Sequence, residues 1–69
     1  MERKNTARID ALGDVLDALQ RAADAGALAT SAGRTAASSV ASGLQRLAAQ
    51  AGALDLSDAI VEFQVNWSL

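Results

Sequence analysis

The stretch that decides the fold is residues 55–69, DLSDAIVEFQVNWSL, which contains the only Phe and the only Trp of the 69-residue chain. Its bulky apolar residues follow one another at intervals of four, three and four: Leu56, Ile60, Phe63 and Trp67. Because an α-helix repeats every 3.6 residues, this spacing places the four side chains on one face. The stretch therefore predicts an amphipathic helix over about residues 56–68.

Polar residues at the beginning of this helix suit a helix N-terminus. Asp55 or Ser57 can cap the free N–H groups, and Asp58 puts negative charge in the positive first turn. Two uses of the apolar face stay open: it closes the chain's own core, or it docks on a partner protein. Trp67 fits both uses, because Trp supplies bulk in a core and is also common among the residues that dominate binding energy.

A thinner apolar seam near the N-terminus predicts a first helix over about residues 6–25. Its members recur at intervals of three and four residues: Ile9, Leu12, Leu16, Leu19 and Ala23. Asn5 or Thr6 is the expected cap, and Gly26 the expected stop. Gly13 in the middle of this helix indicates a close approach by another helix.

A stripe of charged residues shares the outer face of this first helix. Its members are Asp10, Asp14, Asp17, Arg21 and Asp24. We expect this stripe to be a solvated face, because Asp17 and Arg21 form a favourable pair while Asp10 and Asp14 repel each other.

A second seam predicts a helix over about residues 36–52. Its members are Val40, Leu44, Leu47, Ala51 and Leu54. Continuing this phase beyond Leu54 would put Asp58 among the apolar residues, whereas the stripe that follows restarts at Leu56. The phase therefore breaks near Gly52, which predicts a turn before the last helix.

The stretch between the two seams, residues 26–43, reads GALATSAGRTAASSVASG and consists almost entirely of small residues. Clusters of Ser, Thr and Gly usually form loops, so we expect a flexible connector over about residues 26–35. A second interpretation rests on Ala29, Gly33, Ala37 and Ala41, which recur every four residues and would let two helices pack closely.

The composition predicts one small all-α domain over residues 1–69, with two or three helices in a helical hairpin or small bundle. The chain has no Pro, and it lacks the runs of β-branched residues that favour strands. A domain of this size buries only about 60% of its unfolded surface. It has no Cys or His for a disulfide or metal site, and 17 of its apolar residues are Ala. We therefore expect oligomerisation or a partner to complete the bundle.

The charge distribution limits the classes of partner. A net charge of −2 and a pI near 4.7 provide no basic surface for nucleic acid. No apolar run approaches the roughly 18 residues of a membrane span.

Arg3 and Lys4 are followed by Asp10 and further acidic residues, so we expect no cleaved signal peptide, and either a cytoplasmic location or export without cleavage. Since no Lys or Arg follows Arg46, a surface that meets the polar side of the last helix should be basic.

No pattern in the chain indicates catalysis or cofactor binding. Asp55, Asp58 and Glu62 come nearest to a metal site, but they provide too few oxygen ligands. Nucleophile elbows, phosphate loops and dinucleotide fingerprints are absent from the sequence. We therefore predict no catalytic, cofactor or metal residues and no enzymatic activity.

Residues 55–63, DLSDAIVEF, resemble the segment that opens the C-terminal helix of flagellar rod and hook proteins. In those axial proteins an Asp-Leu pair precedes an acidic residue, Met or Ile, Val and an apolar position. The resemblance implies a helical subunit or accessory of a filament-like assembly, with the terminal helix packed among its neighbours.

These observations predict a non-enzymatic structural protein that assembles with itself or with a larger protein assembly. The alternative is a small adaptor that docks its C-terminal helix into a groove of one specific partner. The residues predicted to lie at the interface are the bulky members of the three seams: Leu12, Leu16, Leu19, Leu44, Leu47, Leu56, Ile60, Phe63 and Trp67.

Overall fold

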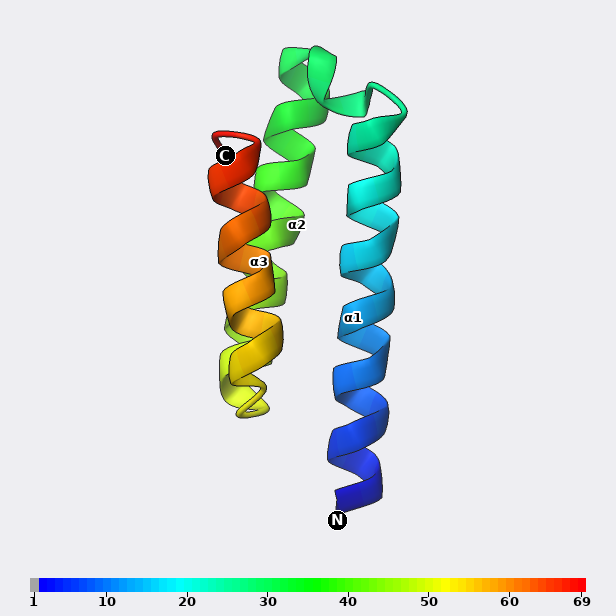
Figure 1. The fold of residues 1–69 in the computed structure, drawn as a ribbon, viewed down its shortest axis with the longest axis vertical. Helices are drawn as coiled ribbons and strands as arrows, with labels where there is room; N and C mark the ends of the chain where they lie inside the picture. Colours follow the sequence, from blue (N-terminus) through cyan, green and yellow to red (C-terminus); the bar gives the residue numbers. More distant parts are fainter. Residues whose placement is uncertain (1) are drawn as a thin grey trace.

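The computed structural model describes the backbone of residues 2–69 and the side chains of residues 6–69. The described residues form three α-helices and one short 3-10 helix, and they contain no strand (Figure 1). The elements are α1 (Glu2–Asp24), η1 (Ala27–Ala29), α2 (Ser31–Gln50) and α3 (Leu54–Asn66). The predicted all-α fold of two or three helices is confirmed, and the number of helices is three.

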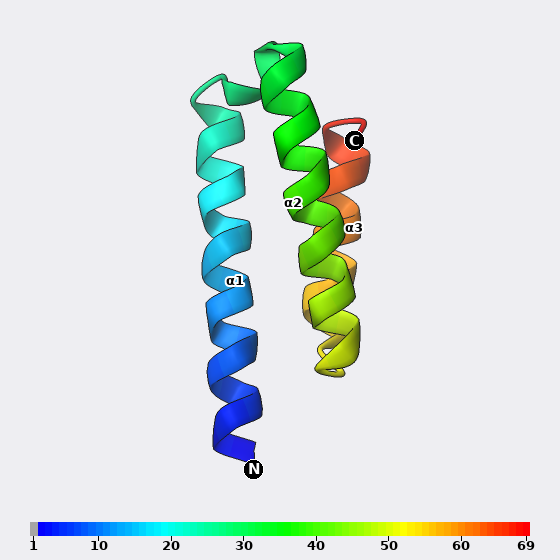
Figure 2. The same cartoon turned by 180° about the vertical axis from the view of Figure 1, so that it is seen from behind.

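The three helices form an elongated bundle of 41 × 17 × 15 Å. α1 and α2 are antiparallel, and α3 turns back along α2, so that α1 and α3 run in the same direction (Figure 1). α3 packs chiefly on α2, and α1 contacts α2 more extensively than it contacts α3. Figure 2 shows from behind that the first turns of α1 extend beyond the corner between α2 and α3.

Glycines in the left-handed region end the first two helices, as the sequence predicts. Gly26 has φ 97° and follows the end of α1, and Gly52 has φ 71° at the corner before α3. At that corner the Gly52 N–H donates to the carbonyl of Ala49 at 3.1 Å, and the Ala53 N–H donates to the carbonyl of Ala48 at 2.9 Å. These two bonds satisfy carbonyls that the helix itself leaves unpaired. The break in apolar phase near Gly52 is therefore a helix end.

The predicted connector over residues 26–35 is too long, because α2 begins at Ser31. Thr30 caps this helix: its hydroxyl oxygen accepts a hydrogen bond from the Gly33 N–H at 3.0 Å. The remaining connector is itself ordered into η1, where the Leu28 side chain is buried. The run of small polar residues therefore contains the start of a helix, although its composition is typical of a loop.

The other helix starts also differ from prediction. α1 begins at Glu2, before the expected cap at Thr6, while the side chain of Asn5 lies outside the described residues. α3 begins at Leu54 with Ala53 at its N-cap, and no side chain caps it. The prediction that Asp55 or Ser57 caps α3 is therefore wrong, since both lie inside the helix. Asp55 in the first turn still interacts favourably with the helix dipole.

The core contains six large apolar side chains and five alanines. Its members are Leu12, Leu16, Ala23, Leu28, Ala37, Ala41, Leu44, Ala48, Ala53, Ile60 and Phe63. Three of the four core residues of α2 are alanines, which leave room for the bulky side chains of the neighbouring helices.

The second predicted seam is therefore mostly wrong. Val40 is 41% exposed, Leu47 is 44% exposed and Leu54 is 72% exposed, so only Leu44 of its bulky members is buried. The row of small residues in the alternative interpretation agrees better with the buried face, because Ala37 and Ala41 both lie in the core. α2 presents its small residues inward and several of its large ones to solvent.

Candidate functional site

The apolar face of α3 closes the chain's own core. Ile60 is fully buried and Phe63 nearly so, while Leu56 and Trp67 are half-buried and pack against the core. Among the other predicted interface residues, Leu12, Leu16 and Leu44 are buried, and Leu19 is half-buried against the core. Leu47 alone among the nine is exposed. The predicted residues are thus mainly interior residues.

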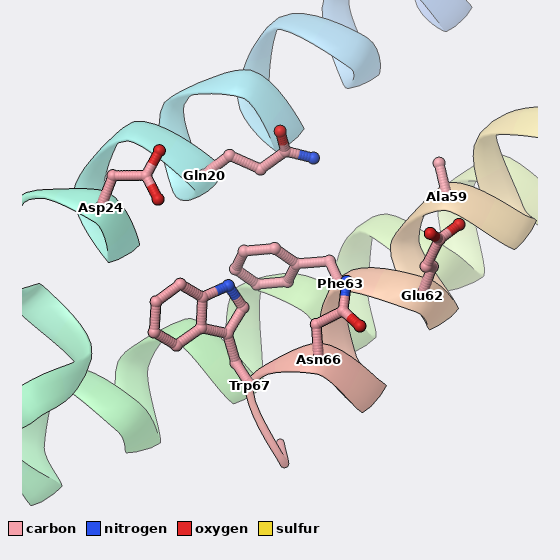
Figure 3. Close-up of a pocket in the computed structure, with 7 residues that line it drawn as sticks. All are labelled: Gln20, Asp24, Ala59, Glu62, Phe63, Asn66 and Trp67. Carbon is pink, nitrogen blue, oxygen red and sulfur yellow. The ribbon is translucent and has the colours of Figure 1, made fainter.

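A hollow of about 310 Å³ lies between α1 and α3, near the C-terminal ends of both helices. Figure 3 shows Gln20 and Asp24 extending from α1 toward this space, opposite the ring of Phe63 from α3 and the ring of Trp67, which directly follows α3. Ala59, Glu62 and Asn66 complete the lining on the α3 side. The hollow therefore combines an aromatic floor with carboxylates and amides at its edges.

A second hollow lies between the same two helices, nearer the N-terminus of α1. Its lining residues are Ile9, Asp10, Gly13, Asp14, Leu16 and Asp17 from α1, and Leu56 from α3. An adjoining hollow at the corner before α3 shares Ile9 and Leu56 and adds Asp55. We call these three hollows together the α1–α3 groove.

The charges along the α1–α3 groove all have the same sign. Asp10, Asp17 and Asp24 recur every seven residues and so form one row along α1, with Asp14 beside them. On the α3 side, Asp55 and Glu62 line the groove, also seven residues apart. No described Lys or Arg is among the lining residues. The expected acidic stripe is exposed, but it also forms one edge of a hollow, which periodicity alone does not reveal.

Small residues keep the floor of the α1–α3 groove open. Gly13 lies in its lining, and a Cβ atom added there would meet nothing within 4 Å. The predicted close approach of another helix to Gly13 therefore does not occur among the residues that the structure describes. Ala59 on α3 is half-buried in the same groove.

Arg34 determines how the groove ends, and sequence reasoning missed it. Its guanidinium donates to the backbone carbonyl oxygens of Trp67 and Ser68, each at 3.0 Å. Ser68 adopts φ 57°, and the Leu69 N–H donates to the carbonyl of Gln64 at 2.7 Å. The bond to Gln64 satisfies a carbonyl in the last turn of α3, and the two bonds from Arg34 hold the backbone of Trp67 and Ser68, which directly follows α3.

Two kinds of feature are absent from the described part of the chain. Its residues contain no group of three or more carboxylates placed to bind a metal ion. None of the described helices is both long enough and apolar enough to cross a membrane. Comparison of the chain with protein-family models, with curated proteins and with solved structures found no match.

Proposed function

We propose that the chain is a non-enzymatic helical subunit that completes its interior by packing against copies of itself within a larger helical assembly. The observation that carries this proposal is the distribution of large apolar side chains. Six of them are buried in the described part of the chain, and six others are exposed: Val15, Val40, Leu47, Leu54, Val61 and Val65. A bundle with so small a core gains stability when such side chains are covered.

The exposed apolar residues are arranged in stripes. Val40 and Leu47 are seven residues apart on α2, and this spacing puts them on one side of the helix. Leu54, Val61 and Val65 share one side of α3 in the same way. Scattered apolar residues are normal on a surface, whereas aligned ones are typical of an interface. We call these two sets the α2 stripe and the α3 stripe.

The resemblance of residues 55–63 to flagellar rod and hook proteins supports a more specific form of the proposal, a filament-like axial assembly. In this form the α3 stripe contacts neighbouring subunits, and the buried face of α3 stays on α2. The alternative, in which α3 docks its apolar face on a partner, requires α3 to leave α2, because Ile60 and Phe63 are buried there.

Sedimentation velocity of the purified chain at several micromolar concentrations tests the proposal. We expect a mass that increases with concentration and decreases in the double variants Val40→Gln/Leu47→Gln and Val61→Gln/Val65→Gln. Since these side chains are exposed, circular dichroism should show unchanged helicity. Ser42→Gln, at an exposed position on α2, is the control and should assemble as the unmodified chain does. A monomer at all concentrations that melts cooperatively would contradict the proposal.

A further inference from the structure

We infer that the α1–α3 groove binds an amphipathic helix from a different protein, with an apolar stripe and Lys or Arg on both sides of it. This inference rests on the proposed function, because it adds a partner to an assembly subunit. It uses a separate surface, however, since the α2 stripe does not line the groove and only Leu54 of the α3 stripe touches its corner.

The length and lining of the groove suit one helix. Residues 9–24 of α1 line it, and at a rise of about 1.5 Å per residue they span about 22 Å, enough for about 15 residues of a partner helix. Leu56, Phe63 and Trp67 provide apolar surface along the α3 side. Gly13 and Ala59 leave space for side chains that enter from outside. A helix placed there would make a four-helix bundle from three helices.

The charges determine which kind of helix binds. Carboxylates line both sides of the groove, and no described cation among the lining residues neutralises them. Lys and Arg side chains on a bound helix can lay their apolar stems along the edges of the groove while their charged ends meet the carboxylates. A helix with acidic sides would instead be repelled.

A second copy of the chain fits the groove poorly. α3 contains no Lys or Arg, so the α3 of another copy would bring like charge to a groove that six carboxylates already line. The α1 of another copy contains four Lys and Arg residues but five acidic ones, so its net charge is also negative. In α2 the guanidinium of Arg34 is bonded to the end of α3, which leaves Arg46 as the other cation of that helix. Charge complementarity therefore favours a basic helix from another protein.

A synthetic peptide tests this inference. The probe is a helix of about 18 residues with Leu at its core positions and Lys beside them, and the control peptide has Glu in place of every Lys. Binding is measured by calorimetry and by the fluorescence of Trp67, which lies half-buried in the groove. We expect the Lys peptide to bind and to lose about tenfold in affinity when salt is added to about 0.5 M. The Glu peptide should not bind.

Two kinds of groove variant test separately how charge and free space contribute to binding. Asp17→Asn/Asp24→Asn should weaken binding about three- to tenfold, because each exposed ion pair is worth up to about fivefold. Asp58→Asn is the matched control, since Asp58 is exposed on α3 and lines none of the three hollows. Gly13→Gln should weaken binding about tenfold by filling the groove. It also improves helix propensity, so its effect cannot arise from unfolding.

Two results would overturn the inference: no binding of the Lys peptide to the folded chain, or equal loss of affinity in Asp58→Asn and the groove variants. Sedimentation of the same samples distinguishes this outcome from failure of the proposed function. If the chain forms oligomers but does not bind the peptide, the inference about the groove is wrong and the proposed self-assembly stands. If the chain is a monomer at all concentrations but binds the peptide, the proposed self-assembly is wrong and the inference about the groove stands. The Val40→Gln/Leu47→Gln variant should bind the peptide as the unmodified chain does.

Discussion

The guanidinium Nη2 of Arg34 donates to the backbone carbonyl oxygen of Trp67 at 3.0 Å and so joins the beginning of α2 to the end of α3. The last carbonyls of a helix lack intrahelical donors and carry partial negative charge, which a cation stabilises. The bond connects residues 33 positions apart in the sequence. It therefore couples the position of Trp67, and with it the end of the α1–α3 groove, to the start of α2.

Arg34→Ala should reduce the free energy of unfolding by about 1–2 kcal/mol, because two hydrogen bonds from a charged donor are lost at a partly buried site. Urea unfolding followed by circular dichroism measures this change. Arg46→Ala is the control: Arg46 is exposed on the same helix, and its replacement should change stability by less than about 0.5 kcal/mol. Equal effects of the two variants would show that Arg34 does not stabilise α3.

Gly33→Ala should destabilise the chain by about 1–3 kcal/mol. A Cβ atom at this position would overlap the backbone carbonyl of Ala27, and backbone cannot move aside as a flexible side chain can. Gly43→Ala is the matched variant in the same helix. A Cβ atom there meets nothing within 4 Å, so it should raise stability by about 0.5–1 kcal/mol through helix propensity. Thermal unfolding of both variants gives the comparison, and the same sign for both would contradict the close approach.

Ser68→Gly should raise the free energy of unfolding by about 0.5–1 kcal/mol. Ser68 adopts φ 57° after α3, in a left-handed conformation that costs other residues energy and glycine almost none. The melting temperature should rise by about 3–6 °C in a domain of this size. Gly52→Ala makes the reverse change at the other helix end, where φ is 71°, and should lower the melting temperature. No rise for Ser68→Gly would argue against this conformation.

Ile60→Val should cost about 0.5–1.5 kcal/mol, because Ile60 is fully buried and the lost methyl group leaves a cavity. Val65→Ala removes two methyl groups from the same helix at a position that is 70% exposed, and it should cost less than about 0.5 kcal/mol in the monomer. Chemical unfolding at low protein concentration measures both. A larger loss for Val65→Ala than for Ile60→Val would show that the buried face of α3 contains Val65 and not Ile60.

The sequence predicts what depends on bulky residues at regular intervals and on glycines at helix ends. The stripe Leu56, Ile60, Phe63 and Trp67 faces the core as its spacing indicates, and the stop signals at Gly26 and Gly52 agree with the helix ends. Both results follow from local rules, since a helix fixes which residues share a face and only glycine adopts positive φ at low cost.

Features that depend on how the helices of the chain pack against one another could not be predicted in the same way. The inward face of α2 is decided by which surface fits α1 and α3, so Ala41 and Ala48 are fully buried while Leu47 is exposed. Hydrophobicity alone predicts that Leu47 is buried, whereas close packing between the helices favours burial of the small side chains of Ala41 and Ala48. The groove and the Arg34 contact likewise arise from residues distant in sequence, for which one chain offers no periodic signal.

The alanine side of α2 has a consequence for any attempt to strengthen this chain. Ala41 and Ala48 have no exposed surface, so a larger residue at either position must force helices apart and costs about 1–3 kcal/mol. The interior has no room to grow, and added stability has to come from outside it. The routes left are better helix ends, higher helix propensity at surface positions, and a neighbouring molecule that covers exposed valines and leucines; only the last of these would depend on assembly.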